Sequence, residues 1–296
     1  MAFRNLIVAA FLFLSTPCIA QNTILWSVDH IDSQHRSYLL GTFHQVGSTW
    51  VDSLTMVMEK LAAADLVIFE SIETGTELQS SMASREWNSG FRDELRKRDI
   101  AWLEAYTSDW VVPIEKLTPM ELHWKLSQDM ARVICNTSSP ADRFDHFDNY
   151  LIHISDSLGL KYVGLETDSM QSEFINEHAG ENTWSALKKT IHSDVRTLRR
   201  GKAKRGQCNF ANKYLRLELG NYPLDRECPE RGDAAVSARN REWMMALPDY
   251  LMEQSCFVAV GLLHLFYDCG LINALREEGF VLAPVYDLKD PPNVEQ

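Results

Sequence analysis

The chain has 296 residues and a formal net charge of −12, and its length suits one large domain or two tightly fused ones. An acidic balance of this size argues against nucleic acid as a partner, because phosphate backbones bind clustered Lys and Arg. The sequence contains no GxSxG, HExxH, P-loop or GxGxxG motif. Elbow-type serine hydrolases, zincins and nucleotide-binding proteins are therefore removed from the leading candidates.

Residues 1–20 have the layout of a secretory signal peptide. Arg4 supplies a positive charge, residues 6–14 form an apolar run, and a small-residue stretch ends at Ala20. The run is too short for a permanent membrane helix, and no second stretch of membrane length follows. We expect a periplasmic or secreted protein that starts near Gln21 and has no stable membrane span.

The first elements of the mature chain predict the start of an α/β layer. Two β-rich runs over 24–28 and 38–42 indicate a β-hairpin. Apolar residues at helical spacing over 53–65 then predict a helix, and the short apolar run over 66–69 predicts a strand that stops at Glu70. Strand, helix and strand in this order are typical of α/β proteins.

The middle of the chain is mostly helical. Helical patterns punctuated by proline fill about 84–153, and a short strand is predicted over 162–165. Helices dominate again over 171–247, and the last of them places Val236, Trp243 and Leu247 on roughly one face. No low-complexity linker divides the chain, so we expect a single domain over 21–296 with a helical insertion.

The C-terminal part returns to strands. A strand is predicted over 257–260, a helix over 271–278 that is closed by Gly279, and a last strand over 280–286. The whole order predicts an α/β fold with a mixed central sheet surrounded by helices.

Five cysteines remain once Cys18 leaves with the signal peptide, and an oxidising compartment favours disulfides among them. We predict a Cys208–Cys228 bridge, because these residues flank a polar segment without strong core periodicity. Cys256 and Cys269 offer a further pair, although a free thiol on the apolar strand of Cys256 is equally ordinary. Spacing does not determine the connectivity. The full set is Cys135, Cys208, Cys228, Cys256 and Cys269.

Two segments share one pattern, an apolar strand followed by Gly-x-x-His. They are YLLGTFH, ending at His44, and VAVGLLH, ending at His264. The glycine lets the backbone turn sharply, and open α/β sheets bind ligands at the carboxyl ends of their strands. A single histidine in such a place is more often a hydrogen-bonded packing residue. The repetition instead suggests a sheet with duplicated strand-GxxH halves.

Glu70 changes the interpretation of these histidines. It ends the strand over 66–69 and would lie at the same sheet edge as His44 if the strands share a sheet. Two imidazoles and one carboxylate are a usual ligand set for a catalytic divalent metal, with an open position for water. We predict a metal site of His44, Glu70 and His264, holding Mn²⁺, Co²⁺ or Zn²⁺, since nitrogen and oxygen ligands do not single out one ion. Considered alone, Glu70 also suits a helix cap or a surface charge.

Three further residues are candidate catalytic groups. Glu166 follows the strand over 162–165, where it would orient a ligand histidine, act as a general base, or form a structural ion pair with Arg239. Arg239 and Asn240 lie on a helix rich in apolar residues. The guanidinium there would hold a substrate oxygen or only tie Glu166 in place.

Together these residues resemble the TraB/GumN family over most of the mature chain. The segments that carry the resemblance are YLLGTFHQVGS, DLVIFE, FDNYLIHISDSLGLKYVGLETDSMQSEF, SARNREW and FVAVGLLHLFYDCGLINALREEGFVLAPV. The stretches over 80–141 and 182–232 match only as generic helices. The residues that match the family motifs are His44, Glu70, Asp148, Leu151, Glu166, Arg239, Asn240 and His264.

The resemblance implies a fold and an activity. The family is similar to the Tiki proteins, which are metal-dependent proteases, and to proteins with an erythromycin-esterase/ChaN-like fold, a mixed sheet with duplicated halves. It implies an exported metal-dependent hydrolase of peptides or proteins. Glu166 would be its base or orienting residue, and Arg239 would stabilise the developing oxyanion. Because Glu70 is followed by Ser-Ile-Glu, Glu73 is an alternative acidic ligand.

Fold likeness alone does not determine activity. An alternative of another class is a non-catalytic exported protein that binds haem or an exopolysaccharide-related ligand in the same cleft. ChaN-like relatives suggest the haem version, and the gumN name suggests the exopolysaccharide version.

Overall fold

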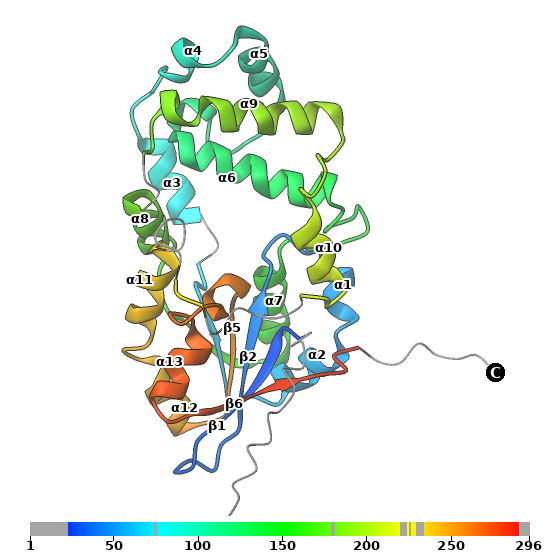
Figure 1. Ribbon diagram of the computed structural model, residues 1–296, viewed down its shortest axis with the longest axis vertical. Helices are drawn as coiled ribbons and strands as arrows, with labels where there is room; N and C mark the ends of the chain where they lie inside the picture. The colour runs from blue at the N-terminus through cyan, green and yellow to red at the C-terminus, as the bar shows by residue number, and fades with distance from the viewer. Residues whose placement is uncertain are drawn as a thin grey trace, which may run out of the picture.

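A six-stranded mixed sheet forms the lower part of the molecule (Figure 1). The computed structural model describes residues 23–73, 76–178, 181–219, 224, 226–228 and 234–289, so the predicted signal peptide lies outside the described residues. The strand order is β4-β3-β5-β2-β1-β6. The strands are β1 (Leu25–Asp29), β2 (Ser37–Thr42), β3 (Leu66–Phe69), β4 (Lys161–Gly164), β5 (Cys256–Gly261) and β6 (Val281–Val285).

The strands β4, β3, β5 and β2 are parallel neighbours, whereas β1 pairs antiparallel with both β2 and β6. Every residue of β3 and β5 is buried, as expected for central parallel strands covered on both faces. The two strands that precede the GxxH histidines lie side by side, with Thr42 opposite Gly261. The predicted hairpin and the predicted mixed α/β fold are confirmed.

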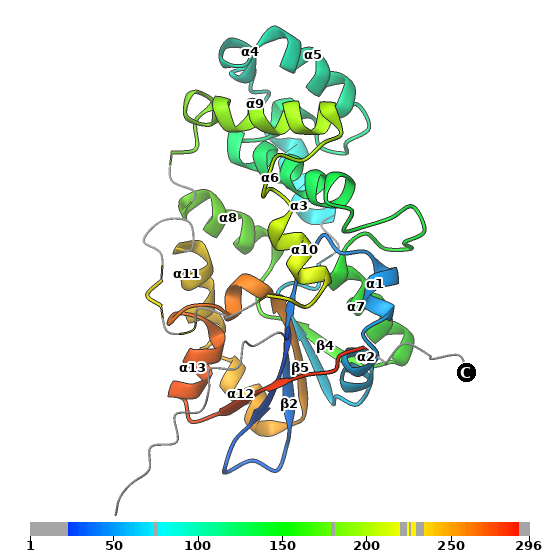
Figure 2. The same ribbon diagram turned by 45° about the vertical axis from the view of Figure 1, so that its right-hand side comes forward.

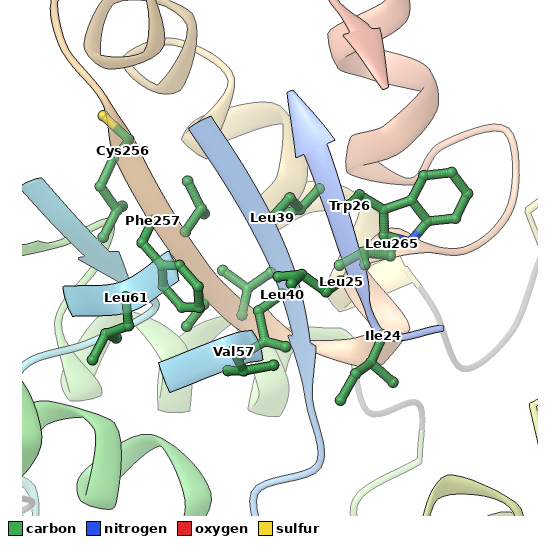
Figure 3. Close-up of a cluster of buried hydrophobic side chains, with 14 of the residues drawn as sticks. Ile24, Leu25, Trp26, Leu39, Leu40, Val57, Leu61, Cys256, Phe257 and Leu265 are labelled. Atoms are coloured by element: carbon green, nitrogen blue, oxygen red, sulfur yellow. The ribbon is translucent and has the colours of Figure 1, made fainter. Parts of the chain in front are cut away.

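Helices cover both faces of this sheet (Figure 2). Val57 and Leu61 pack against Leu40 and Phe257, while the neighbouring Leu39 points to the opposite face, as alternation along a strand requires (Figure 3). The helices on one side are α1 (Ser48–Asp52), α2 (Thr55–Ala62) and α7 (Phe147–Leu158), and those on the other are α11 (Ala234–Trp243), α12 (Leu247–Glu253) and α13 (Leu271–Glu277).

A helical lobe with its own buried cluster lies above the strand ends (Figure 1). Its central helix α6 begins at a capping box, in which Thr118 and Glu121 bond each other's backbone N–H, with Pro119 in the first turn. The cluster includes Leu103, Leu122 and Ile191. The helices of this lobe are α4 (Phe91–Glu94), α5 (Lys97–Tyr106), α6 (Pro119–Asp129) and α9 (Trp184–Arg200).

The remaining helical elements lie within the lobe, between it and the sheet, or after β5. They are α3 (Thr76–Ser84), the 3₁₀ turn η1 (Ile114–Lys116), the π-helix η2 (Met130–Ile134), α8 (Asp168–His178), α10 (Asn209–Leu215) and the 3₁₀ turn η3 (Leu262–Leu265). Within the part of the chain that the structure describes, every helix is too short or too polar to span a bilayer.

The helix predicted to reach Leu247 is shorter than expected. It ends at Trp243, a turn follows, and Leu247 begins a separate helix. Pro248 explains the break, because proline lacks an N–H and fits only the first turn of a helix. Trp243 and Leu247 are both buried, but they lie on different helices.

The predicted Cys208–Cys228 bridge is wrong. Cys208 pairs with Cys135 and Cys228 pairs with Cys269, so each bridge ties distant parts of the chain together. Cys256 is the one free thiol among the described cysteines, and it is buried. The alternative Cys256–Cys269 bridge does not form, because Cys269 is bonded to Cys228 and Cys256 is buried at the start of β5.

Candidate functional site

The carboxyl ends of the parallel strands meet at one edge of the sheet, and the predicted site residues follow them. His44 lies just after β2, Glu70 directly after β3, and His264 in the turn after β5. The Glu166 N–H, after β4, donates to the Glu70 carbonyl oxygen at 2.9 Å and prolongs the pairing of β3 with β4. The sheet therefore brings together residues that are far apart in sequence.

Glu70 is the centre of this arrangement. One carboxylate oxygen, Oε1, accepts the Gly261 N–H at 2.5 Å, and Oε2 accepts from Gln171 Nε2 at 3.0 Å and from Arg239 Nη2. Burial opposes ionisation of this carboxyl, but the attraction of His264, Arg239 and His44 and the Gly261 N–H keep its pKa below the usual range. Glu70 is thus a buried anion.

His44 presents one ring nitrogen to Glu70 while the other is held by Asp148. The distance from Nε2 to Glu70 Oε1 is 4.0 Å, and the distance from Nδ1 to Asp148 Oδ2 is 2.7 Å. The other Asp148 oxygen accepts the Thr42 hydroxyl at 2.9 Å. Burial would lower the pKa of His44, but Asp148 and Glu70 raise it to about 9. The His44 side chain is 35 % exposed, which gives the site its contact with solvent.

His264 is held in the same manner by a different partner. Asn240 Nδ2 donates to the carbonyl oxygens of His264, at 3.1 Å, and Cys269, at 2.9 Å, so its Oδ1 faces His264 Nδ1 at 2.6 Å. Nδ1 must then carry the proton, and Nε2 keeps a lone pair. Nε2 lies 3.6 Å from Glu70 Oε1. Burial lowers the pKa of His264 to about 3, so the ring is neutral.

The glycines of the two GxxH motifs permit close approach. A Cβ at Gly261 would lie 2.9 Å from Glu70 Oε1 and 3.2 Å from His44 Nε2. A Cβ at Gly41 would meet Leu262 Cδ1 at 2.4 Å. Only glycine lets the Gly261 N–H reach the carboxylate while the imidazole lies beside it.

Arg239 and Glu166 form a buried pair. Arg239 donates to both carboxylate oxygens of Glu166, from Nε at 3.0 Å and from Nη2 at 2.6 Å, and Trp243 Nε1 adds a bond at 3.1 Å. Burial raises the pKa of Glu166, and Arg239 partly offsets it. The Glu166 side chain is 1 % exposed. Of the roles considered for Glu166, these contacts fit a structural ion pair with Arg239. Arg239 also links Glu166 to Glu70.

Glu73 and Glu70 line one pocket of about 360 Å³ but differ in their contacts. Glu73 Oε2 accepts the Asp168 N–H at 2.8 Å, whereas the ion pairs with the two histidines are made by Glu70. The pocket is lined by His44, Glu70, Ser71, Glu73, Leu78, Gln79, Gln128, His146, Asp148, Asn149, Asp168 and Gln171.

His146 is a site residue that the sequence analysis missed. Its ring stacks on His44, with centroids 5.4 Å apart. The ligand atoms of His44, His146 and Asp148 all lie within 4.8 Å of one another, so this group can hold a metal ion, and it differs from the predicted set. The sequence did contain a signal for His146. It stands two residues before Asp148, at the N-terminus of α7, so both polar side chains lie at the start of one helix.

A second group of potential ligands, Cys228, Asp268 and Cys269, is also compact. Its two cysteines are joined in a disulfide, and oxidised sulfur does not offer the thiolate that binds metals. Of the two compact groups among the described residues, the one at the sheet edge, His44, His146 and Asp148, still has atoms that can coordinate a metal ion.

The sequence was compared with family models and with curated proteins. The model of the TraB/PrgY/gumN family matches residues 24–284, nearly the whole chain. A search of curated proteins finds no match.

Proposed function

Because the chain belongs to the TraB/PrgY/gumN family, we propose that it is an exported metal-dependent hydrolase, of peptidase type, with a divalent ion held by His44, Glu70 and His264. One observation carries the proposal. Both histidines have Nδ1 engaged by a neighbouring acceptor, and both direct Nε2 toward the same oxygen of Glu70. Ligand histidines in metal sites are typically oriented in this way through their other ring nitrogen.

Two features of the contacts with Glu70 favour an ion. Two ligand atoms that share one ion at about 2.1 Å lie no more than about 4.2 Å apart, and the two nitrogen–oxygen separations, 4.0 and 3.6 Å, meet this limit. The three residues together are not among the groups of described residues whose ligand atoms all lie within 4.8 Å of one another, so binding would draw the two histidine rings closer. In addition, the lone pair of His264 Nε2 faces an anionic oxygen with no proton between them. A divalent cation held by His264 and Glu70 would relieve that repulsion.

The side chains around the proposed ligands have supporting roles. Asp148 orients His44, and Asn240 orients His264. His146 stands next to His44 and is a further ligand candidate from the same compact group. When bound, a divalent ion would supply Lewis acidity, which polarises a carbonyl group and lowers the pKa of a water molecule.

We assign Glu166 the orienting role rather than that of the base. Both its oxygens accept hydrogen bonds, and its side chain is 1 % exposed, so a water molecule has no direct access to it. Arg239 in turn holds Glu70 and balances its negative charge. Arg239 already donates from Nε to Glu166 and from Nη2 to Glu70. These bonds leave it less able to stabilise an oxyanion directly, and that role stays a prediction.

Export rests on the sequence of residues 1–20 and on the two disulfides among the described residues. Disulfides persist in oxidising compartments such as the periplasm or the extracellular space.

The test is a metal-replacement assay on residues 21–296. The protein is stripped with chelator, reloaded with Mn²⁺, Co²⁺ or Zn²⁺, and assayed for cleavage of quenched fluorescent peptides. We expect cleavage only after reloading, and its loss in His44→Ala. His123→Ala is the matched control, because His123 also pairs with a carboxylate, Asp194, at 2.7 Å, but in the helical lobe. Equal activity in the stripped protein would remove the proposal, and a Soret band on haem titration without hydrolysis would support the ligand-binding alternative.

A further inference from the structure

A second cavity adjoins the site pocket. It has a volume of about 230 Å³ and is lined by residues of α3, α6 and α8. These three helices lie where the helical lobe faces the strand ends (Figure 1). The residues that line both cavities are Leu78, Gln79, Gln128, Asp168 and Gln171. Gln171 also donates to Glu70 at 3.0 Å, so the shared wall reaches the proposed metal ligand. A molecule bound at Glu70 therefore lies next to the second cavity.

Five apolar side chains line this second cavity, alongside the charged Glu121 and Lys125 of α6. Leu78 and Met82 come from α3, Trp124 from α6, and the buried Val112 and Leu117 from the segment between α5 and α6. A dry apolar cavity of about 150 Å³ already binds benzene. A volume of about 230 Å³ is thus large enough for one aromatic or branched aliphatic side chain, but small for a cofactor.

The boundary between the two cavities suits a peptide. Gln79, Gln128 and Gln171 stand there, and each carboxamide offers both a donor and an acceptor, the two groups that a peptide backbone presents. Asp168 at the same boundary is acidic and Lys125 on the wall of the second cavity is basic, so charge alone does not select the bound side chain.

We propose that the second cavity is the specificity pocket of the enzyme, which takes one large apolar side chain of a peptide substrate while the adjoining peptide bond lies at Glu70. This inference rests on the proposed function for its catalytic consequence. The substrates would be peptides with a large apolar residue next to the cleaved bond. Residues at the base of the helical lobe, rather than the sheet, would then determine which peptides are cleaved.

The first experiment compares peptides that differ at one position, Phe against Ala, in the metal-loaded protein. We expect kcat/KM to be at least about 10-fold higher for Phe. Met82→Trp fills the cavity from α3 and should remove this preference while cleavage of the Ala peptide continues. Leu158→Trp, at an exposed position of α7, is the matched control and should keep it. Equal rates for the two peptides, or a preference that survives in Met82→Trp, would overturn the inference.

The second experiment does not depend on catalysis. In metal-stripped protein, ligand-observed NMR compares the affinities of N-acetyl-phenylalaninamide and N-acetyl-alaninamide. We expect the Phe probe to bind at least about 10-fold more tightly, and this difference to vanish in Met82→Trp. If Met82→Trp does not fold, Trp124→Ala replaces it, and it should weaken the Phe probe several-fold. An unchanged affinity in the folded variant counts against the pocket.

The two experiments separate the two ideas. Selective binding without hydrolysis under any metal would reject the proposed enzyme and leave the apolar pocket as a binding site. Hydrolysis without selectivity would reject the pocket and leave the enzyme.

Discussion

Asp148→Asn tests how much metal affinity depends on the orientation of His44. Asn keeps the shape of the side chain and can still accept the Thr42 hydroxyl, but it removes the negative charge that faces Nδ1 of His44 at 2.7 Å. Loss of such a partner typically weakens metal binding about 10–100-fold, or about 1.4–2.8 kcal/mol. We expect a loss of this size for Mn²⁺ or Zn²⁺ at pH 7, measured by calorimetry on stripped protein.

A second effect acts in the opposite direction. Asp148 and Glu70 raise the pKa of His44 to about 9, so an incoming ion must displace a proton, and the substitution makes that displacement easier. An affinity that is unchanged or higher in Asp148→Asn would refute the reasoning that orientation dominates. Asp194→Asn changes a similar pair, with His123 at 2.7 Å in the helical lobe, and should leave metal binding as it is.

Four further predictions concern stability and reactivity. The raised pKa of His44 stabilises the metal-stripped protein fully below about pH 6.5, and this contribution is lost as the pH rises through about 9, so Tm should fall over that range and fall less in Asp148→Asn. Gly261→Ala should lower the free energy of unfolding in urea by about 1–3 kcal/mol and weaken metal binding, because its Cβ would lie 2.9 Å from Glu70 Oε1; normal binding would contradict the close approach. Burial raises the pKa of Cys256 to about 12, so mass spectrometry should find it unmodified by iodoacetamide at pH 8 until the chain unfolds, and rapid native alkylation would contradict this. Arg239→Met leaves two carboxylates buried without their partner and should lower the free energy of unfolding by about 3–5 kcal/mol, whereas a loss under 1 kcal/mol would show that water reaches them.

The sheet edge was predictable because its strands have a strong local signal. Continuous apolar runs ending at Glu70 and before the two GxxH histidines are typical of buried parallel strands, and such strands place their carboxyl ends together. The convergence of His44, Glu70 and His264 follows from that topology. The partners that orient them are less visible, since Asp148 and Asn240 lie on helices whose docking onto the sheet has no local signature.

Other features depend on contacts between distant segments. His146 accepts the backbone N–H of Asn149 at the start of α7, a position that reads locally as an ordinary helix cap. The cysteine pairs depend on which segments meet in space, which spacing along the chain does not reveal. The second cavity is lined by residues of α3, α6 and α8 and of the segment before α6, and nothing local in these sequences indicates which of these segments meet.

The bridge between Cys228 and Cys269 lies close to the proposed chemistry. The carbonyl oxygen of Cys269 accepts a hydrogen bond from Asn240, and Asn240 determines which nitrogen of His264 is free. A chain made in the reducing cytosol would lack this tether, and the loop carrying Cys269 would be anchored less firmly. Material refolded or secreted under oxidising conditions is therefore the proper sample for metal titrations, since only the bridged chain holds in place the carbonyl group that positions Asn240.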